Sequence, residues 1–132
     1  MVMKKAIALF VLFTTLVFSQ TSFVYENDHM VMKDNVTGQA ISENYNSFYI
    51  TFTMNDNDIN TGGFSFSTGA YIKLYKLYAN DGVSNWHWNA IDNNNLRCNI
   101  HLNTALEESS NIVYLRIQFN DYSFYYKLKR VG

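Results

Sequence analysis

Residues 113–128 read VYLRIQFNDYSFYYKL, two alternating runs on either side of Asn120-Asp121. Alternation of apolar and polar residues is typical of a strand with one face on the core. A two-residue turn at Asn120-Asp121 matches the apolar faces of the two runs, because side-chain parity must agree across a hairpin. On the apolar face the expected pairs are Ile117 with Phe124, Leu115 with Tyr126 and Val113 with Leu128. On the opposite face they are Arg116 with Tyr125 and Tyr114 with Lys127.

The same parity argument predicts two hairpins upstream. A three-residue loop at Asn93–Asn95 sets Trp88 opposite Ile100 and Trp86 opposite Leu102, whereas loops of two or four residues mix the faces. A three-residue loop at Asn80–Gly82 sets Leu74 opposite Trp88 and Lys76 opposite Trp86. Together the hairpins predict an antiparallel meander from about Tyr71 to Lys129.

Weaker strand patterns precede the meander. They cover Phe23–Glu26, Met30–Lys33, Ser47–Met54 and Gly63–Ser67, with a turn at Asp34–Gly38 and one helical-turn candidate at Thr104–Ser109. Eight or nine antiparallel strands in one all-β domain can form a two-sheet β-sandwich or a flattened β-barrel. We expect the sandwich, with the barrel as the alternative.

Alternation also predicts the core. The residues expected to be buried are Phe48, Ile50, Phe52, Leu74, Trp88, Leu96, Cys98, Ile100, Leu102, Leu115 and Ile117. Trp86 shares the parity of Trp88, which favours core packing over sugar stacking for both. Cys98 is the single cysteine, so the domain has no internal disulfide and depends on its core.

The N-terminus has the pattern of a secretory signal peptide. Lys4 and Lys5 precede a short apolar run, residues 6–18, and Ser19-Gln20 provides a small residue for cleavage. The apolar run is too short for a spanning helix, which needs about 20 residues; an uncleaved anchor is the alternative. We therefore expect residues 1–19 to be removed and residues 20–132 to form one secreted or periplasmic domain with no membrane association after cleavage.

Charge argues against nucleic acid as a partner. Loss of Lys4 and Lys5 leaves eight basic against eleven acidic residues, a net charge of −3. A nucleic-acid-binding protein normally has a basic patch that neutralises phosphates. The only basic cluster, Lys127 to Arg130, fits a solvated strand end.

The candidate ligand-binding site lies on the polar face of the meander. The predicted registers place Tyr75 opposite His87 and His87 opposite His101, and opposed residues on paired strands are close enough to share a ligand. The residues expected around the two histidines are Lys73, Asn89, Asn99 and Tyr114. This face suits a sugar or another small ligand, or a weak metal site; an ordinary solvated sheet face is the alternative.

The stretch from Asp56 to Gly62 resembles the start of a calcium loop. Its candidate ligands are Asp56, Asp58 and Asn60, but Thr61 and Ser67 occupy the positions where the pattern requires Gly and Glu. A turn explains the stretch equally well, so we expect no metal and no cofactor. The triplet Asn35-Val36-Thr37 fits an N-glycosylation acceptor and also fits a turn.

The function expected is that of a non-enzymatic domain that binds an unknown protein, small molecule or glycan. One alternative is a small hydrolase or metal-dependent enzyme that uses His87 and His101, although no catalytic motif is present. A second alternative is a structural component of the envelope or an inhibitor.

Overall fold

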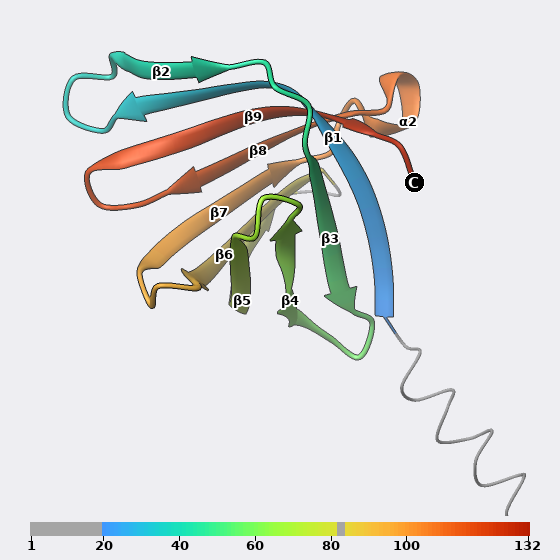
Figure 1. The fold of residues 1–132 in the computed structure, drawn as a ribbon. Helices are drawn as coiled ribbons and strands as arrows, with labels where there is room; N and C mark the ends of the chain where they lie inside the picture. The colour runs from blue at the N-terminus through green and yellow to red at the C-terminus, as the bar shows by residue number, and fades with distance from the viewer. Residues whose placement is uncertain (1–19, 82–83) are drawn as a thin grey trace, which may run out of the picture.

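The computed structural model describes residues 20–81 and 84–132, so the expected signal peptide lies outside the described residues. These residues form an all-β antiparallel barrel, shown in Figure 1. The strands are β1 (Gln20–Asp34), β2 (Ala40–Asn44), β3 (Tyr49–Asn55), β4 (Asp58–Phe66), β5 (Tyr71–Asp81), β6 (Asn85–Asp92), β7 (Arg97–Asn103), β8 (Ile112–Gln118) and β9 (Tyr122–Arg130).

The long strand β1 closes the barrel. One edge of β1 pairs with β3 through Gln20–Glu26 and with β2 through Met30–Lys33. The other edge of β1 pairs with β9 along Tyr25–Asp34. The order β1-β3-β4-β5-β6-β7-β8-β9 therefore returns to β1 as a closed eight-stranded barrel, with β2 as one additional strand. The barrel alternative is confirmed and the two-sheet sandwich is not.

Two of the three predicted registers are confirmed. In the β8–β9 hairpin all five predicted pairs occur, and the backbone bond from Phe119 N to Tyr122 O frames the two-residue turn. In the β6–β7 hairpin Trp88 pairs with Ile100 and Trp86 with Leu102. Asp92 shapes this turn, because its Oδ1 accepts hydrogen bonds from the backbone of Asn94 and Leu96.

The predicted register between β5 and β6 is wrong. Leu74 pairs with Ala90, Trp88 pairs with Leu77, and Ala79 takes the place opposite His87. The register shifts twice along β5, which leaves Tyr75 and Tyr78 as extra residues in β-bulges. Lys76 pairs with Asn89 instead of Trp86, and β5 extends to Asp81, so Asn80 and Asp81 are not loop residues as expected.

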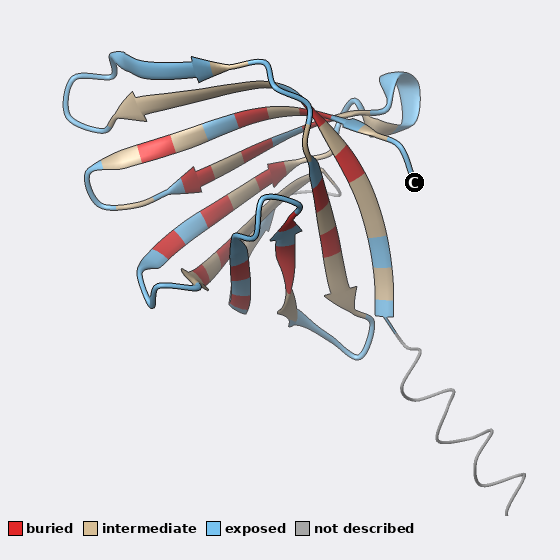
Figure 2. Ribbon diagram, in the orientation of Figure 1, coloured by how far each residue is buried: buried red, intermediate tan, exposed pale blue. Residues whose placement is uncertain are grey.

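The barrel interior is filled by the core. Buried residues alternate with more exposed ones along the barrel strands (Figure 2). Of the residues expected to be buried, Phe48 is only partly buried and Leu96 is 50% exposed, because it lies in the β6–β7 turn rather than in β7; the others are buried. The indole of Trp88 is satisfied by a 3.0 Å hydrogen bond to the carbonyl of Ile59.

The N-terminal region differs from expectation in its strand boundaries, while the expected turn at Asp34–Gly38 is present. The two short strands expected between residues 23 and 33 are one strand, β1, with a register shift between Asn27 and His29. The following turn is fixed by Asn35, whose Nδ2 donates to the carbonyls of Phe119 and Asn120 and whose Oδ1 accepts from Ser123. This use of both amide atoms favours the turn interpretation of the glycosylation triplet.

A single helical turn, α2 (Glu107–Ser110), lies between β7 and β8 and overlaps the expected Thr104–Ser109 turn. Within residues 20–81 and 84–132, no helix has the length and apolar character to cross a lipid bilayer.

Candidate functional site

The two histidines of the predicted site do lie together. His87 and His101 are register partners on β6 and β7, and their rings stack with centroids 4.3 Å apart and planes within 4°. His101 Nε2 also lies 3.0 Å from Asn85 Oδ1. The pair faces outward, because both residues alternate with neighbours that belong to the core or pack against it: Trp86, Trp88, Ile100 and Leu102.

The remaining predicted residues are divided between separate surfaces. Because β5 runs on to Asp81, which pairs with Asn85, the residue opposite His87 is Ala79; Tyr75 instead lines a polar depression with Asn89 and Asn99. Tyr114 pairs with Asn103 and lines a different groove, together with His101. Lys73 is exposed and pairs with Ile91. The structure therefore does not assemble the predicted row around Tyr75, and ligand binding on this face remains a prediction.

The metal candidates have structural partners. Asp58 Oδ1 accepts hydrogen bonds from Asn60, and Asp56 accepts one from Thr21. In the described ranges, no group of three or more His, Cys, Asp or Glu side chains is placed to hold a metal ion. A catalytic zinc normally has three protein ligands; the metal-dependent alternative at His87 and His101 stays a prediction.

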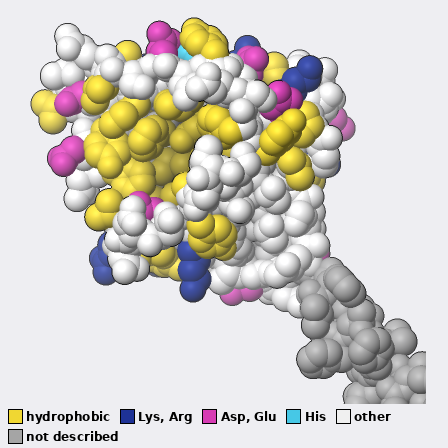
Figure 3. Space-filling model, viewed as in Figure 1, with side chains coloured by type: hydrophobic (Ala, Val, Ile, Leu, Met, Phe, Trp, Pro, Cys, Tyr) yellow, Lys and Arg dark blue, Asp and Glu magenta, His cyan; other side chains and the backbone are white. Residues whose placement is uncertain are grey.

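A hollow of about 360 Å³ opens at the end of the barrel where β8–β9, β6–β7 and β4–β5 turn. Figure 3 shows it as a recess lined by hydrophobic side chains on the face viewed in Figure 1. Its wall carries six aromatic residues, namely Phe48, Phe66, Phe119, Tyr122, Phe124 and Tyr126, with Ile72 and Ile117 below them. We call this hollow the open mouth.

The six rings of the open mouth form one connected network. Phe48 contacts Phe66 and Tyr126, and Phe124 links Tyr126 to Phe119 and Tyr122, with ring centroids 5.4–6.4 Å apart. Four of the rings (Phe48, Phe119, Tyr122 and Phe124) are only partly buried. The mouth therefore exposes an apolar, aromatic wall to water.

Polar groups form the rim of the open mouth. Thr68, Asp92, Asn93 and Asn94 come from two turns, and the carboxylate of Asp92 is held by its own turn. Burial raises the pKa of Tyr126 above its ordinary range, so its phenol is neutral at physiological pH. An apolar wall with a few polar groups at the edge is typical of small-molecule sites.

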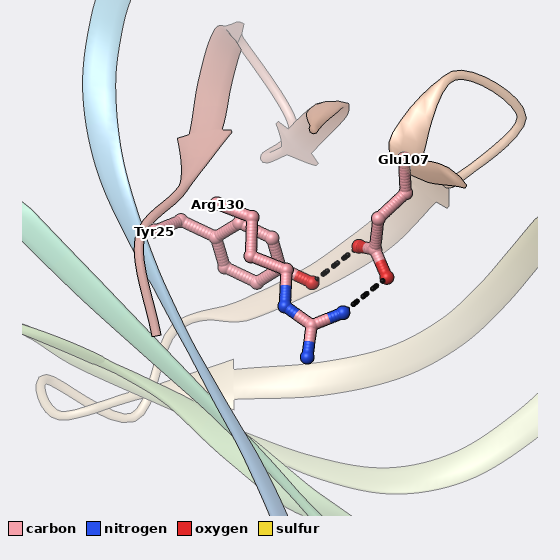
Figure 4. Close-up of polar contacts among 3 residues, drawn as sticks. All are labelled: Tyr25, Glu107 and Arg130. Atoms are coloured by element: carbon pink, nitrogen blue, oxygen red, sulfur yellow. Dashed lines mark hydrogen bonds and ion pairs between the residues drawn. The ribbon is translucent and has the colours of Figure 1, made fainter. Parts of the chain in front are cut away.

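The opposite end of the barrel is closed by polar contacts. The Tyr25 hydroxyl donates to Glu107 Oε2 at 2.8 Å, and Arg130 Nη1 donates to Glu107 Oε1 at 3.3 Å (Figure 4). Burial, then the hydrogen bond and charge of Glu107, raise the pKa of Tyr25. The hollow left at this end, lined by Trp86 and Trp88 among others, is smaller at about 200 Å³.

Sequence reasoning missed the open mouth. Four of its rings lie between Phe119 and Tyr126, but Phe48 and Phe66 come from distant segments, just before β3 and in β4, so no local spacing connects all six. The available signal was the high aromatic content, 17% of the chain, which exceeds what the predicted core positions use.

Comparison of the chain with protein-family models, curated proteins and solved structures finds no match.

Proposed function

We propose that this protein is a non-enzymatic binding protein that takes one small, neutral, ring-containing molecule into the open mouth of its barrel. The observation that carries the proposal is the connected network of six aromatic rings around a 360 Å³ hollow. An eight-stranded barrel is just wide enough to be filled by side chains or to hold one small ligand. Barrel mouths are also among the places where ligand sites occur most often.

The size of the mouth limits the ligand. An apolar cavity of about 150 Å³ holds one benzene molecule, so 360 Å³ has room for about two rings. Partly buried Phe119 and Phe124 lose further contact with water when a ligand enters, which favours binding in proportion to the apolar area covered. Aromatic neighbours add offset or edge-to-face contacts with the ligand ring.

We place the ligand in the open mouth rather than at the other end of the barrel, because no helical turn covers the aromatic wall of the mouth. At the other end Glu107, in α2, and Arg130 form an ion pair of 3.3 Å beside the smaller hollow. A neutral ring entering there has to pass this pair.

Isothermal titration with 2-naphthol, a neutral two-ring probe, tests the proposal. Phe119→Ala should weaken binding by about tenfold, since removal of one well-packed aromatic contact commonly costs more than 1 kcal/mol. Ala70→Trp places a large side chain at the mouth and should abolish binding. Ala70 is exposed, so this change leaves the core intact.

Phe23→Ala is the matched control. Phe23 is also a partly buried phenylalanine, but it lines the opposite end of the barrel. Its loss should leave the affinity for 2-naphthol unchanged. Failure of the wild-type protein to bind 2-naphthol, or equal weakening by Phe119→Ala and Phe23→Ala, contradicts the proposal.

The proposal includes action outside the cytoplasm. Its support is the sequence pattern of Lys4-Lys5, the apolar run 6–18 and Ser19-Gln20.

A further inference from the structure

A second hollow lies on the outer surface of the barrel, away from the open mouth. It has a volume of about 260 Å³ and crosses β7, β8, β9 and β1. The polar and aromatic residues that line it are His29, His101, Tyr114, Arg116, Tyr125, Tyr126 and Lys127. We call it the Arg116 groove.

Several residues of the groove belong to a continuous row of register partners that crosses six strands. His87 pairs with His101, His101 with Arg116, and Arg116 with Tyr125. Tyr125 pairs in turn with Val31, and Val31 with Glu43 on β2. The histidine pair expected from the sequence thus continues toward Arg116 rather than toward Tyr75.

Arg116 differs from the other permanently charged residue of the groove wall, Lys127, in having no acidic partner among the described residues. Lys127 Nζ lies 3.5 Å from Asp28, and His29 Nε2 lies 2.8 Å from Glu43. Arg116 is in no salt bridge in residues 20–81 and 84–132, and its Nε is buried without a hydrogen-bond partner. A buried donor left unpaired is costly, and the side chain that carries it lines the groove.

Further positive charge surrounds the position. Lys33 lies over the Tyr125 ring at 5.0 Å from its centroid, so a further cation lies beside the residue that pairs with Arg116. The guanidinium group binds a carboxylate in a planar, two-pronged geometry. Tyr114 and Tyr125 line the groove together with Arg116, and tyrosine rings suit stacking with a sugar.

We infer that the Arg116 groove binds an acidic sugar, with Arg116 paired to the sugar carboxylate and the two tyrosines against the sugar ring. The volume of 260 Å³ accommodates one six-membered ring with a carboxylate. Among the described residues, the groove shares only Tyr126 with the open mouth, and the lining of the mouth contains the carboxylate of Asp92 and no cation, so a sugar carboxylate is disfavoured there.

Three probes test the inference by NMR titration of the Arg116 Nε–Hε and His101 resonances. D-glucuronate should shift both resonances saturably. D-glucose, which has the same ring with a hydroxymethyl group in place of the carboxylate, should shift neither. Acetate, which has the carboxylate without the ring, should bind at least about tenfold more weakly than glucuronate, because the ring contacts are lost.

Variants separate the role of Arg116 from general surface charge. Arg116→Gln should weaken glucuronate binding by about tenfold or more, since a charge-assisted hydrogen bond is lost. Arg116→Lys keeps the positive charge but removes the planar guanidinium group, and it should give a smaller loss of glucuronate affinity than Arg116→Gln. Arg97→Gln is the matched control, because Arg97 is exposed and lies outside the groove. It should bind glucuronate like the wild-type protein.

Thermal unfolding of Arg116→Gln provides a second readout. Because the substitution removes a buried donor without a partner, the variant should be at least as stable as the wild-type protein. Equal responses to glucuronate and glucose, acetate affinity equal to that of glucuronate, or unchanged binding by Arg116→Gln overturns the inference. None of these results bears on 2-naphthol binding at the open mouth.

Discussion

The hydroxyl of Tyr25 donates a 2.8 Å hydrogen bond to the carboxylate of Glu107, 82 residues away in the sequence. The bond joins the strand that closes the barrel to the helical turn before β8, and Arg130 binds the other oxygen of the same carboxylate. The two barrel ends consequently differ: one is held by this polar triad, and the other is an open aromatic mouth.

The Tyr25→Phe variant should lose stability. It removes a hydrogen bond to a charged acceptor inside a part-buried site, which typically contributes about 1.5–3 kcal/mol. Urea unfolding measures the loss, with Tyr49→Phe on an exposed ring as the control. If both variants lose the same amount, the Tyr25–Glu107 bond does not stabilise the barrel.

Stability should fall in alkaline solution. Burial raises the pKa of Tyr25 and Tyr126 and, with the nearby charge of Asp92, raises the pKa of Cys98 to about 12. In the unfolded chain a thiol titrates near about 8.5 and a phenol near about 10. The folded state therefore binds more protons above about pH 8.5, and its stability decreases as the pH rises from there toward 12.

Urea midpoints measured from pH 7.5 to 11 test this slope. Cys98→Ala should flatten the decrease between about pH 8.5 and 10, where the thiol of the unfolded chain ionises. A midpoint that rises with pH, or an identical slope in the variant, would contradict the prediction. It would show that the buried groups ionise as easily in the folded protein as in the unfolded chain.

Ile100→Ala and Leu96→Ala should differ sharply. Ile100 is fully buried in β7, so its truncation leaves a cavity and should cost about 2–5 kcal/mol of unfolding free energy. Leu96 is 50% exposed in the adjacent turn, and its loss should cost less than about 1 kcal/mol. Chemical denaturation compares the two; equal losses would place Leu96 in the core.

The exported protein should begin at Gln20 or within a few residues of it. The basis is the charged start at Lys4-Lys5 and the small residue Ser19 before the expected cut. Edman degradation or intact mass spectrometry of the protein from the producing cell's envelope or medium reads this directly. A form that retains Met1 would rule out cleavage.

Local alternation predicted the fold where it was uninterrupted. In β8–β9 no residue breaks the period of two, so parity alone determined the register of Leu115 and Tyr126. In β5 the strand runs on to Asp81, which pairs with Asn85, so the turn comes two residues later than predicted; a shift of two residues keeps parity, and a parity count cannot detect it. The predicted pairing with His87 is therefore wrong for Tyr75, whereas the pairing of His87 with His101 is confirmed.

The closed barrel could not be predicted from local pattern. Closure depends on pairing between β1 and β9, for example Tyr25 with Arg130, about a hundred residues apart. The strand β2 was missed because residues 40–43 are exposed and show no apolar alternation. The open mouth exists only in the closed barrel, so it could not be predicted from the local sequence pattern.

Methyl NMR of the protein with 2-naphthol tests the central claim most directly. Ile72 and Ile117 lie at the open mouth, and Leu102 lies at the opposite end, so the three methyl groups report which end is occupied. The account predicts saturable shifts and ligand contacts (intermolecular NOEs) at Ile72 and Ile117, with Leu102 unchanged. Shifts confined to Leu102, or no shift at any of the three, would contradict it.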